Sequence, residues 1–306
     1  MIKKQITDKY LVEHLANLSE DAREVFLLED GKFRATIISA THLLNQMRAN
    51  HNLGVVESLI LGQAYIASGL LSATVKGNDR IQLSVECGGP IEGIYTEAWA
   101  CGAIRGYLKN NPIELKKPLT SFDTSDLYGP GFLSISKLIE GNKSPFTGQT
   151  MLQSGNLSQD LAVYFKESEQ TPSLFNLSID FDENGKIIGA GGLFIQALPG
   201  CNDEDLEKME KKASALPSLS KSITKNINLK EYIIANFINA NHLAHEIVGF
   251  SCPCSRNNFL KHLAGLPKKE KHQILQNGPF PLTLTCFNCN SDYEFSESEI
   301  KELFKL

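Results

Sequence analysis

Four cysteines near the C-terminal end of the chain have the types and spacing of a metal site. One residue separates Cys252 from Cys254, two residues separate Cys286 from Cys289, and residues 255–285 lie between the two pairs. Zinc favours four ligands in a tetrahedron, and four thiolates with Zn–S bonds of about 2.3 Å are a common ligand set. The sequence therefore predicts that Cys252, Cys254, Cys286 and Cys289 bind one zinc ion per chain in the reduced state.

The segment around these cysteines is small, so its folding should depend on the metal. Residues 246–306 are too few to bury a large core. Zinc binding contributes roughly 10–16 kcal/mol in small peptides, and we expect it to supply much of the folding free energy. Oxidation of the thiolates would remove the ligands and unfold this segment. Close spacing favours the disulfides Cys252–Cys254 and Cys286–Cys289, while pairs between the two motifs stay open.

Two other interpretations use the same cysteines. A zinc ribbon that only stabilises a small domain is the simplest, since closed four-thiolate sites are usually structural. The Cys-x-Cys half argues against it, because ribbons usually carry two Cys-x-x-Cys turns. A thiol–disulfide oxidoreductase would need its Cys-x-x-Cys at the start of a helix in a βαβ unit. Cys286 instead follows Leu282 and Leu284, which alternate as in a strand.

The remaining residues that could do chemistry give weaker signals. Cys87, Cys101 and Cys201 are isolated, and a lone cysteine is usually a small buried hydrophobic residue. His242 and His245 stand three apart, which predicts one face of a helix, and four thiolates leave no place for them on zinc. The sequence shows no phosphate loop, dinucleotide fingerprint, HExxH motif or nucleophile elbow. We therefore expect a protein that is not an enzyme.

Charge and hydropathy limit the partners of the chain. The formal net charge is −5 without a dominant basic block, which argues against nucleic-acid binding. The short run Lys268-Lys269-Glu270-Lys271 keeps a zinc-ribbon nucleic-acid-binding protein as the alternative. The uncharged stretch 58–75 contains polar residues and glycines, so it predicts a buried core helix and no membrane association. The basic start lacks the apolar run of a signal peptide, which predicts a cytoplasmic protein with reduced thiols.

The elements that must position the cysteines predict an α+β fold. Alternating apolar residues predict strands at 81–87 and 177–181, and Asn184-Gly185 predicts a hairpin turn into a return strand at 187–195. Helices are expected at 158–168 with Ser158 as N-cap, from Asp203 onward, at 230–240, at 256–264 and at 268–275. Three parts follow: a large N-terminal β-sheet domain with packed helices at 1–200, a helical linker at 201–245, and a small C-terminal zinc-binding domain at 246–306.

Several short motifs also occur in a fixed order along the chain. They are Arg105-Gly106-Tyr107, the segment Asp160–Phe165, Leu198-Pro199-Gly200, the two cysteine pairs and Tyr293-Glu294-Phe295. Together they resemble the redox-regulated heat-shock protein of 33 kDa, also called the 33-kDa chaperonin family, over nearly the whole chain.

This resemblance implies a redox-regulated, ATP-independent chaperone, a holdase that protects unfolding and oxidatively damaged proteins from aggregation during oxidative stress. It implies that the reduced, zinc-bound form is inactive. Oxidation would form the two disulfides, release zinc, unfold the C-terminal part, loosen the linker and expose apolar surface. The active form would be a homodimer, and neither nucleic acid nor a membrane is an expected partner.

Overall fold

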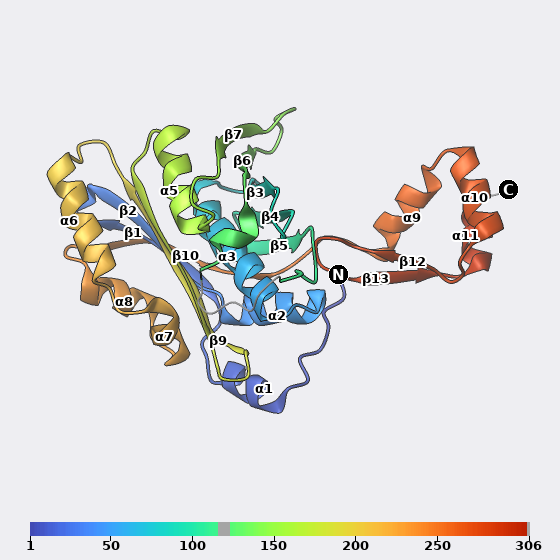
Figure 1. The fold of residues 1–306 in the computed structure, drawn as a ribbon, viewed down its shortest axis with the longest axis horizontal. Coiled ribbons are helices and arrows are strands. Elements are labelled where there is room, and N and C mark those ends of the chain that lie inside the picture. The colour runs from blue at the N-terminus through green and yellow to red at the C-terminus, as the bar shows by residue number, and fades with distance from the viewer. Residues whose placement is uncertain (116–122, 305–306) are drawn as a thin grey trace.

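The fold combines two large β-sheets with helices on their faces. The computed structural model describes residues 1–115 and 123–304 of the chain. Its elements form one broad body and a smaller C-terminal part that projects from it (Figure 1). The α+β class expected from the sequence is confirmed.

A five-stranded antiparallel sheet forms one layer of the broad body. Its strands lie in the order β10 (Asn241–Ile247), β1 (Ala22–Leu28), β2 (Phe33–Ser39), β9 (Ile187–Ala197) and β8 (Ser173–Phe181). The predicted hairpin is formed by β8 and β9, and Gly185 takes a φ of 71° in its turn. The predicted strands at 177–181 and 187–195 are thus confirmed, and both are longer than expected.

A six-stranded sheet forms a second layer. Its strands lie in the order β11 (Gly249–Phe250), β5 (Ala103–Leu108), β4 (Gly93–Trp99), β3 (Arg80–Cys87), β6 (Gly131–Leu138) and β7 (Phe146–Met151). All neighbours are antiparallel except β11, which runs parallel to β5. Ile81, Leu83 and Val85 of β3 are buried while Gln82 and Ser84 are partly exposed, which confirms the predicted period of two.

Two helices fill the space between the sheets. Both α2 (Thr41–His51) and α3 (Val55–Leu71) contact strands of each sheet. Burial on all sides explains why α3 lacks a polar face. By length and a mean hydropathy of 1.4, residues Val55–Thr74 would suit a membrane span, but 83% of that window lies buried inside the protein. The predicted core helix is therefore confirmed.

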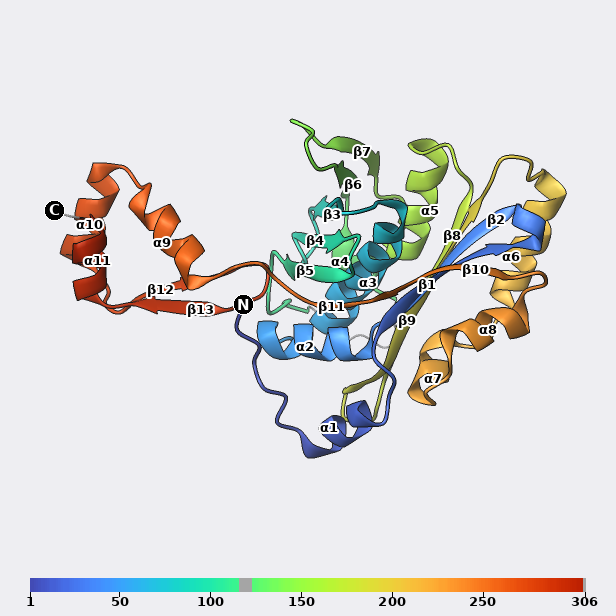
Figure 2. The ribbon, with the colours of Figure 1, turned by 180° about the vertical axis from the view of Figure 1, so that it is seen from behind.

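Three further helices cover the opposite face of the five-stranded sheet (Figure 2). They are α6 (Asp203–Ser214), which begins at a capping box of Asn202 and Asp205, α7 (Leu219–Thr224) and α8 (Leu229–Asn236). The helices and the sheet bury a second core, whose members include Phe26, Leu28, Phe33, Ile37, Leu193, Ile195, Met209, Leu219, Ile223, Tyr232 and Ile233. The polar stretch expected to be a linker thus lies closely over the sheet.

The remaining helices of the broad body are short. They are α1 (Lys9–Ala16), α4 (Ser125–Tyr128), α5 (Leu157–Glu167) and the 3-10 turns η1 (Glu29–Gly31) and η2 (Ser72–Thr74). The predicted helix at 158–168 is confirmed as α5, but its N-cap is Asn156 and not Ser158. The side chain of Asn156 accepts hydrogen bonds from the backbone N–H groups of Ser158 and Gln159, which makes it the better cap.

The helix expected to contain His242 and His245 is a strand. Both residues lie in β10, and α8 already ends at Asn236. The apolar residues Leu243, Ala244 and Ile247 are spaced as on a helix face, but the edge of β1 pairs with this segment instead. Sheet pairing with a distant strand therefore overrides the local pattern.

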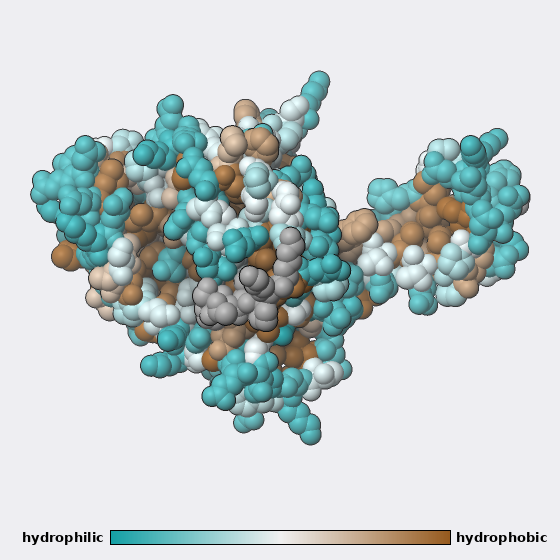
Figure 3. Space-filling model, in the orientation of Figure 1, coloured by the Kyte–Doolittle hydropathy of each residue, from teal (hydrophilic) through white to brown (hydrophobic). Residues whose placement is uncertain are grey.

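Residues 251–304 form the part that projects from the broad body, and we call them the C-terminal module. It contains α9 (Arg256–Ala264), α10 (Lys268–Asn277), the hairpin of β12 (Leu282–Thr285) and β13 (Asp292–Phe295), and α11 (Glu297–Phe304). The two predicted short helices are confirmed as α9 and α10. The module's core is small, with Leu263, Tyr293, Phe295, Ile300 and Phe304 as its buried members. Apolar side chains gather at its centre and hydrophilic ones along its outer edge (Figure 3).

Candidate metal centre

The four predicted cysteines come together where the C-terminal module joins the broad body. Their sulfur atoms all lie within 4.8 Å of one another. The sulfur atoms of Cys252 and Cys286 are 3.8 Å apart, and those of Cys254 and Cys289 are 3.3 Å apart. Cys254 is partly exposed and the other three are buried. Four sulfur atoms at these distances can bind a single metal ion.

The distances between the sulfur atoms fit a tetrahedral ion. Four thiolates about 2.3 Å from a zinc ion would lie about 3.8 Å from one another, because the edge of a tetrahedron is about 1.6 times its centre-to-corner distance. The distance between Cys252 and Cys286, 3.8 Å, matches this value, and that between Cys254 and Cys289 is shorter at 3.3 Å. The donor set therefore suits zinc as well as other soft ions that thiolates bind.

Two short backbone segments hold the cysteines in place. Cys252 and Cys254 directly follow β11, whose pairing with β5 fixes the start of the segment. Cys286 follows β12, and the chain then turns so that Cys289 comes back beside it. The backbone N–H groups of Cys289 and Asn290 both donate to the carbonyl oxygen of Cys286, at 3.2 and 2.7 Å. The predicted strand before Cys286 is confirmed as β12.

Arg105 of β5 lies against the first cysteine pair. Its Nη1 is 3.2 Å from the sulfur of Cys252, and its Nε donates to the carboxylate of Glu97 at 2.8 Å. The guanidinium also lies over the ring of Trp99, 5.1 Å from the ring centre. Glu97 and Trp99 belong to β4, so the six-stranded sheet holds a cation beside a candidate metal ligand. Such a charge-assisted contact stabilises a thiolate.

The two residues after Arg105 contact the second cysteine pair. The N–H of Gly106 donates to the carbonyl oxygen of Asn288 at 3.2 Å. The ring centre of Tyr107 is 6.0 Å from that of Phe287. A Cβ added at Gly106 would lie 2.2 Å from a carbonyl oxygen of β4, so a side chain does not fit there. The motif Arg105-Gly106-Tyr107 thus connects β5 to both cysteine pairs.

The end of α2 makes a second contact with the turn of the second cysteine pair. The side-chain amide of Asn50 donates to the carbonyl oxygens of Cys289 and Ile2, both at 2.9 Å. In return, the side chain of Asn290 donates to the carbonyl oxygen of Asn50 at 2.8 Å. The hydroxyl of Ser291 donates to the same carbonyl oxygen of Ile2. Three segments far apart in the sequence therefore meet at the metal centre.

Hydrogen bonds among the thiols distribute negative charge unevenly. Hydrogen bonds from Cys286 and Cys289, and a further one from Arg105, hold the pKa of Cys252 well below that of an ordinary thiol. The same interaction with Cys252 raises the pKa of Cys286 to about 11. Without a metal, the thiol of Cys252 thus ionises more readily than that of Cys286. A bound divalent ion would favour the thiolate at all four residues, because only thiolates serve as ligands.

The other candidate residues lie away from the metal centre. His242 Nε2 and His245 Nδ1 lie 2.6 and 2.7 Å from the carboxylate oxygens of Glu24, so both histidines face β1 and not the cysteines. Among the isolated cysteines, Cys87 and Cys201 are partly buried while Cys101 is exposed. The expectation of a buried thiol is therefore wrong for Cys101, because its turn between β4 and β5 faces solvent.

Three residues without a predicted role lie beside the clustered cysteines. The hydroxyl of Tyr293 lies 3.4 Å from the sulfur of Cys254, and that of Ser291 lies 3.2 Å from the sulfur of Cys289. Both residues follow Cys289 closely in the sequence, so their nearness was a usable signal. Asn50 lies far away along the chain, and no pattern in the sequence marks it.

Comparisons with known proteins agree with the fold and the cysteine cluster. The family model described as Hsp33 protein matches residues 21–296. The 33 kDa chaperonin of Desulforamulus reducens is 35% identical over 280 residues, which cover 90% of this chain and 94% of that protein. The 33 kDa chaperonin of Streptococcus sanguinis is 30% identical over 284 residues, which cover 90% of this chain and 96% of that protein.

A solved structure of a 33 kDa chaperonin also shares the fold of this chain. The crystal structure of the 33 kDa chaperonin, a heat shock protein 33 homolog, from Thermotoga maritima aligns with a TM-score of 0.82 at 29% sequence identity. The alignment covers 94% of this chain and 98% of that one. The range matched by the family model also includes all four clustered cysteines. The chain therefore belongs to the Hsp33 family of 33 kDa chaperonins.

Proposed function

We propose that this chaperone is an ATP-independent holdase whose activity is controlled by oxidation of the four clustered cysteines. The family is one of chaperones without enzymatic activity, and its partners are client proteins. The observation that carries the proposal is the position of the cluster. Its sulfur atoms lie within 4.8 Å of one another at the joint between the C-terminal module and the broad body.

In the reduced state, Cys252, Cys254, Cys286 and Cys289 would hold one zinc ion and the protein would be inactive. Zinc supplies a fixed tetrahedral centre that neutralises part of the thiolate charge. Residues 251–304 have only a small core of their own, so the ion supplies a large share of their stability. The contacts of Arg105 and Asn50 then keep the module docked on β5 and α2.

Oxidation would convert the ligands into disulfides Cys252–Cys254 and Cys286–Cys289. In each pair, one sulfur gives two electrons to an oxidant such as peroxide and becomes a sulfenic acid, which the second thiol attacks with loss of water. The short distances between Cys252 and Cys286 and between Cys254 and Cys289 also permit pairs between the motifs. Either pairing removes the thiolates that bind the ion, and the module then loses its main source of stability.

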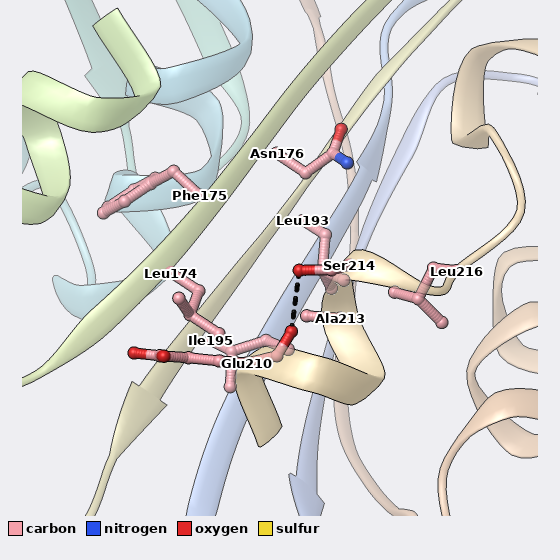
Figure 4. A pocket seen from close by; sticks show the side chains of 9 residues that line it. All are labelled: Leu174, Phe175, Asn176, Leu193, Ile195, Glu210, Ala213, Ser214 and Leu216. Carbon is pink, nitrogen blue, oxygen red and sulfur yellow. Dashed lines mark hydrogen bonds between the residues drawn. The ribbon is translucent and has the colours of Figure 1, made fainter. Parts of the chain in front are cut away.

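Unfolding of the C-terminal module would loosen the linker, because β10 and β11 connect the module directly to α6, α7 and α8. These helices cover the apolar face that β1, β2 and β9 present. A pocket of about 380 Å³ already interrupts the cover beside α6 (Figure 4). Its apolar lining includes Leu174, Leu193, Ile195, Ala213 and Leu216. Release of the helices would expose the whole face to segments of unfolding clients.

The other parts of the proposal come from the family resemblance and from composition. We propose that residues 1–200 act as the chaperone core, 201–245 as the linker and 246–306 as the redox switch. The clients would be unfolding and oxidatively damaged proteins, and the active form would be a homodimer in the cytoplasm. We expect no binding to nucleic acid or membranes, since the net charge of −5 opposes the former.

Light scattering of an enzyme that aggregates on heating tests this function. The protein oxidised with peroxide at mild heat should suppress the scattering, whereas the reduced, zinc-loaded protein should not. Equal suppression by both forms would refute redox control. Failure of both forms to suppress scattering would refute the holdase activity.

A further inference from the structure

An exposed thiol outside the four-cysteine cluster lies beside a pocket that the proposed switch does not use. Cys101 is exposed in the turn between β4 and β5, and it lines a pocket of about 770 Å³. One wall of the pocket comes from β1, β2 and β10 of the five-stranded sheet. The other comes from residues 73–77 and from the turn with Cys101. The pocket therefore lies where the two sheets meet, next to the strand that leads to the C-terminal module.

The pocket carries a positive charge. Its charged lining residues are Arg23, Arg34, Lys76 and Glu246, and its remaining titratable residues are His245 and Cys101. With His245 neutral, three cations face one carboxylate. In the described part of the chain, neither arginine forms an ion pair with a carboxylate oxygen. A concave surface with this imbalance concentrates small anions.

Arg23 forms no ion pair with a carboxylate of the described residues, although Glu246 also lines the pocket. This side chain is only 5% exposed, and it donates to the carbonyl oxygens of Gly69 and Ala100 and to the hydroxyl of Ser72. Among the described residues, 1–115 and 123–304, its Nε has no hydrogen-bond partner. A buried guanidinium without a carboxylate partner is unfavourable. Burial accordingly lowers the pKa of Arg23 to about 10. An anion bound in the pocket would compensate this charge.

We propose that the pocket binds small disulfides that carry carboxylates, and that Cys101 forms a mixed disulfide with them. The thiolate of Cys101 attacks one sulfur of the bound disulfide, whose S–S bond breaks as the new bond to Sγ forms. The other half leaves as a thiolate and takes up the proton that Cys101 lost. The sulfur of Cys101 is oxidised, and the departing sulfur is reduced. Arg23, Arg34 and Lys76 bind the carboxylates.

This site goes beyond the four-cysteine switch, because it uses a different thiol and needs no metal. Arg34 donates to the carbonyl oxygen of Ala73 at 2.6 Å, so its guanidinium is fixed at the wall of the pocket. The side chain of Lys76 is exposed and makes no hydrogen bond or ion pair in the described residues, so its ammonium group is available to a ligand. Leu243, Ala244 and Glu246 of β10 form the far wall. An adduct on Cys101 therefore lies beside the strand that joins the broad body to the switch.

The test compares three disulfides on the full-length, zinc-loaded protein. Oxidised glutathione carries carboxylates, hydroxyethyl disulfide is neutral, and cystamine is cationic. The rate of adduct formation at Cys101 is measured by mass spectrometry of the peptide that contains it. Each rate is divided by the rate of the same disulfide with N-acetylcysteine. We expect the normalised rate to be several-fold higher for oxidised glutathione than for hydroxyethyl disulfide, and lowest for cystamine.

Charge variants show whether the pocket causes this preference. One unit charge a few ångströms away changes binding roughly five-fold in water. Lys76→Gln should therefore lower the normalised rate with oxidised glutathione by about that factor and leave hydroxyethyl disulfide unaffected. Lys221→Gln, an exposed lysine on α7 outside the pocket, is the matched control and should change neither rate. Cys101→Ser should abolish the adduct on this peptide.

Two results would overturn the proposal. Equal normalised rates for the three disulfides would show that Cys101 is only an exposed thiol. A preference for oxidised glutathione that persists unchanged in both Lys76→Gln and Arg34→Gln would show that the pocket does not bind the carboxylates.

Discussion

At the scale of single residues, Arg105 makes the most direct contact between the sheet and the metal centre. It lies 3.2 Å from the sulfur of Cys252 while Glu97 holds it from the other side. We expect Arg105→Met to weaken zinc retention, because it removes a charge-assisted hydrogen bond of about 1.5–3 kcal/mol. Zinc release during a peroxide titration, followed with a coloured chelator, should then occur at lower peroxide.

Arg80 provides a matched control for this prediction. Its Nε lies 3.4 Å from the carboxylate of Glu97, and its guanidinium lies over Trp99, as that of Arg105 does. No contact of Arg80 with a cysteine is found in the described residues. Arg80→Met should therefore leave zinc release near that of the wild type. An equal effect of both variants would mean that the loss arises from Glu97 and not from the contact with Cys252.

His51, at the end of α2, should make stability depend on pH. Burial lowers the pKa of His51 to about 4, whereas an unfolded histidine has a pKa near 6.5. Between these values the unfolded chain binds a proton that the folded chain does not. The free energy of unfolding should thus fall as pH decreases from about 6.5 to 4, by about 3 kcal/mol at most.

Urea titrations of the wild type and of His51→Phe across this pH range measure the effect. Other groups titrate alike in both proteins, so the difference between the two unfolding curves isolates His51. The wild type should lose stability relative to the variant as pH falls. A difference that stays constant with pH would contradict a buried neutral imidazole.

The residues of the metal centre divide into those the sequence reveals and those it does not. The four cysteines were predicted because their spacing is itself the signal of a zinc site. The motif Arg105-Gly106-Tyr107 was noticed only through family resemblance, since its contacts with the cysteine pairs join residues more than 140 positions apart. Asn50 was missed because a single asparagine at the end of a helix has many structural uses. Side-chain contacts between distant segments need the fold before they can be seen.

At the scale of elements, α8 should control the activity of the reduced protein. Ile233 of α8 is fully buried against the five-stranded sheet. We expect Ile233→Asn to detach the helix, because the change removes an apolar contact and buries an amide, at a cost of about 2–5 kcal/mol. The reduced, zinc-loaded variant should then suppress aggregation of a heated client, which the wild type in that state should not.

The neighbouring residue is the control. Ile234 lies on the same helix but is 62% exposed. Ile234→Asn should leave the reduced protein inactive. The tertiary packing of the sheets, followed by near-UV circular dichroism, should be retained in both variants. A contrary result is a loosened linker in the circular dichroism of reduced Ile233→Asn while the variant still fails to suppress aggregation. That result would mean that the covered face is not the client site.

Elements with a regular pattern of apolar residues were predicted correctly from the sequence. Elements whose conformation depends on pairing with a distant strand were missed. The strand at β3 and the helices α9 and α10 show clear periods and were placed correctly. Residues 241–247 have a helical spacing of apolar residues, yet they complete a sheet whose next strand ends at Leu28. The sequence of α6 to α8 looks like a polar linker because each helix carries only a few apolar residues, and most of these pack against the sheet.

At the scale of the whole molecule, metal removal should affect one part of the protein and spare the other. Zinc binding is worth roughly 10–16 kcal/mol in small peptides, and the C-terminal module has little other stability. We expect chelation of the reduced protein to abolish protection from hydrogen exchange in α9, α10 and α11. The amides of α3, which lie between the two sheets, should stay protected.

Hydrogen exchange followed by mass spectrometry checks this with and without a chelator, under reducing conditions. Readdition of zinc should restore protection, which separates metal loss from irreversible damage. Protection of α9 to α11 that persists without metal would mean that the module folds on its own small core. Loss of protection in α3 as well would mean that the two parts unfold together.

The assembly of the parts was the least predictable feature. The sequence predicts a sheet domain at 1–200, a linker at 201–245 and a cysteine-bearing domain at 246–306, and this division stays a prediction. The sequence did not indicate that β11 would pair in parallel with β5, nor that α2 would contact the second cysteine pair. A strand of two residues carries no periodic signal, so this joint follows only from the three-dimensional fold.

The pairing of β10 with β1 affects how the protein can fold during its synthesis on the ribosome. β1 ends at Leu28, but its edge partner begins at Asn241, more than 200 residues later. At roughly 5–20 residues per second, synthesis of the intervening chain takes about 10–40 s. The helices that cover the sheet also emerge late in that interval. During translation the nascent protein therefore passes through a stage in which the edge of β1 and an apolar face lie open, and open strand edges of this kind can pair with other chains.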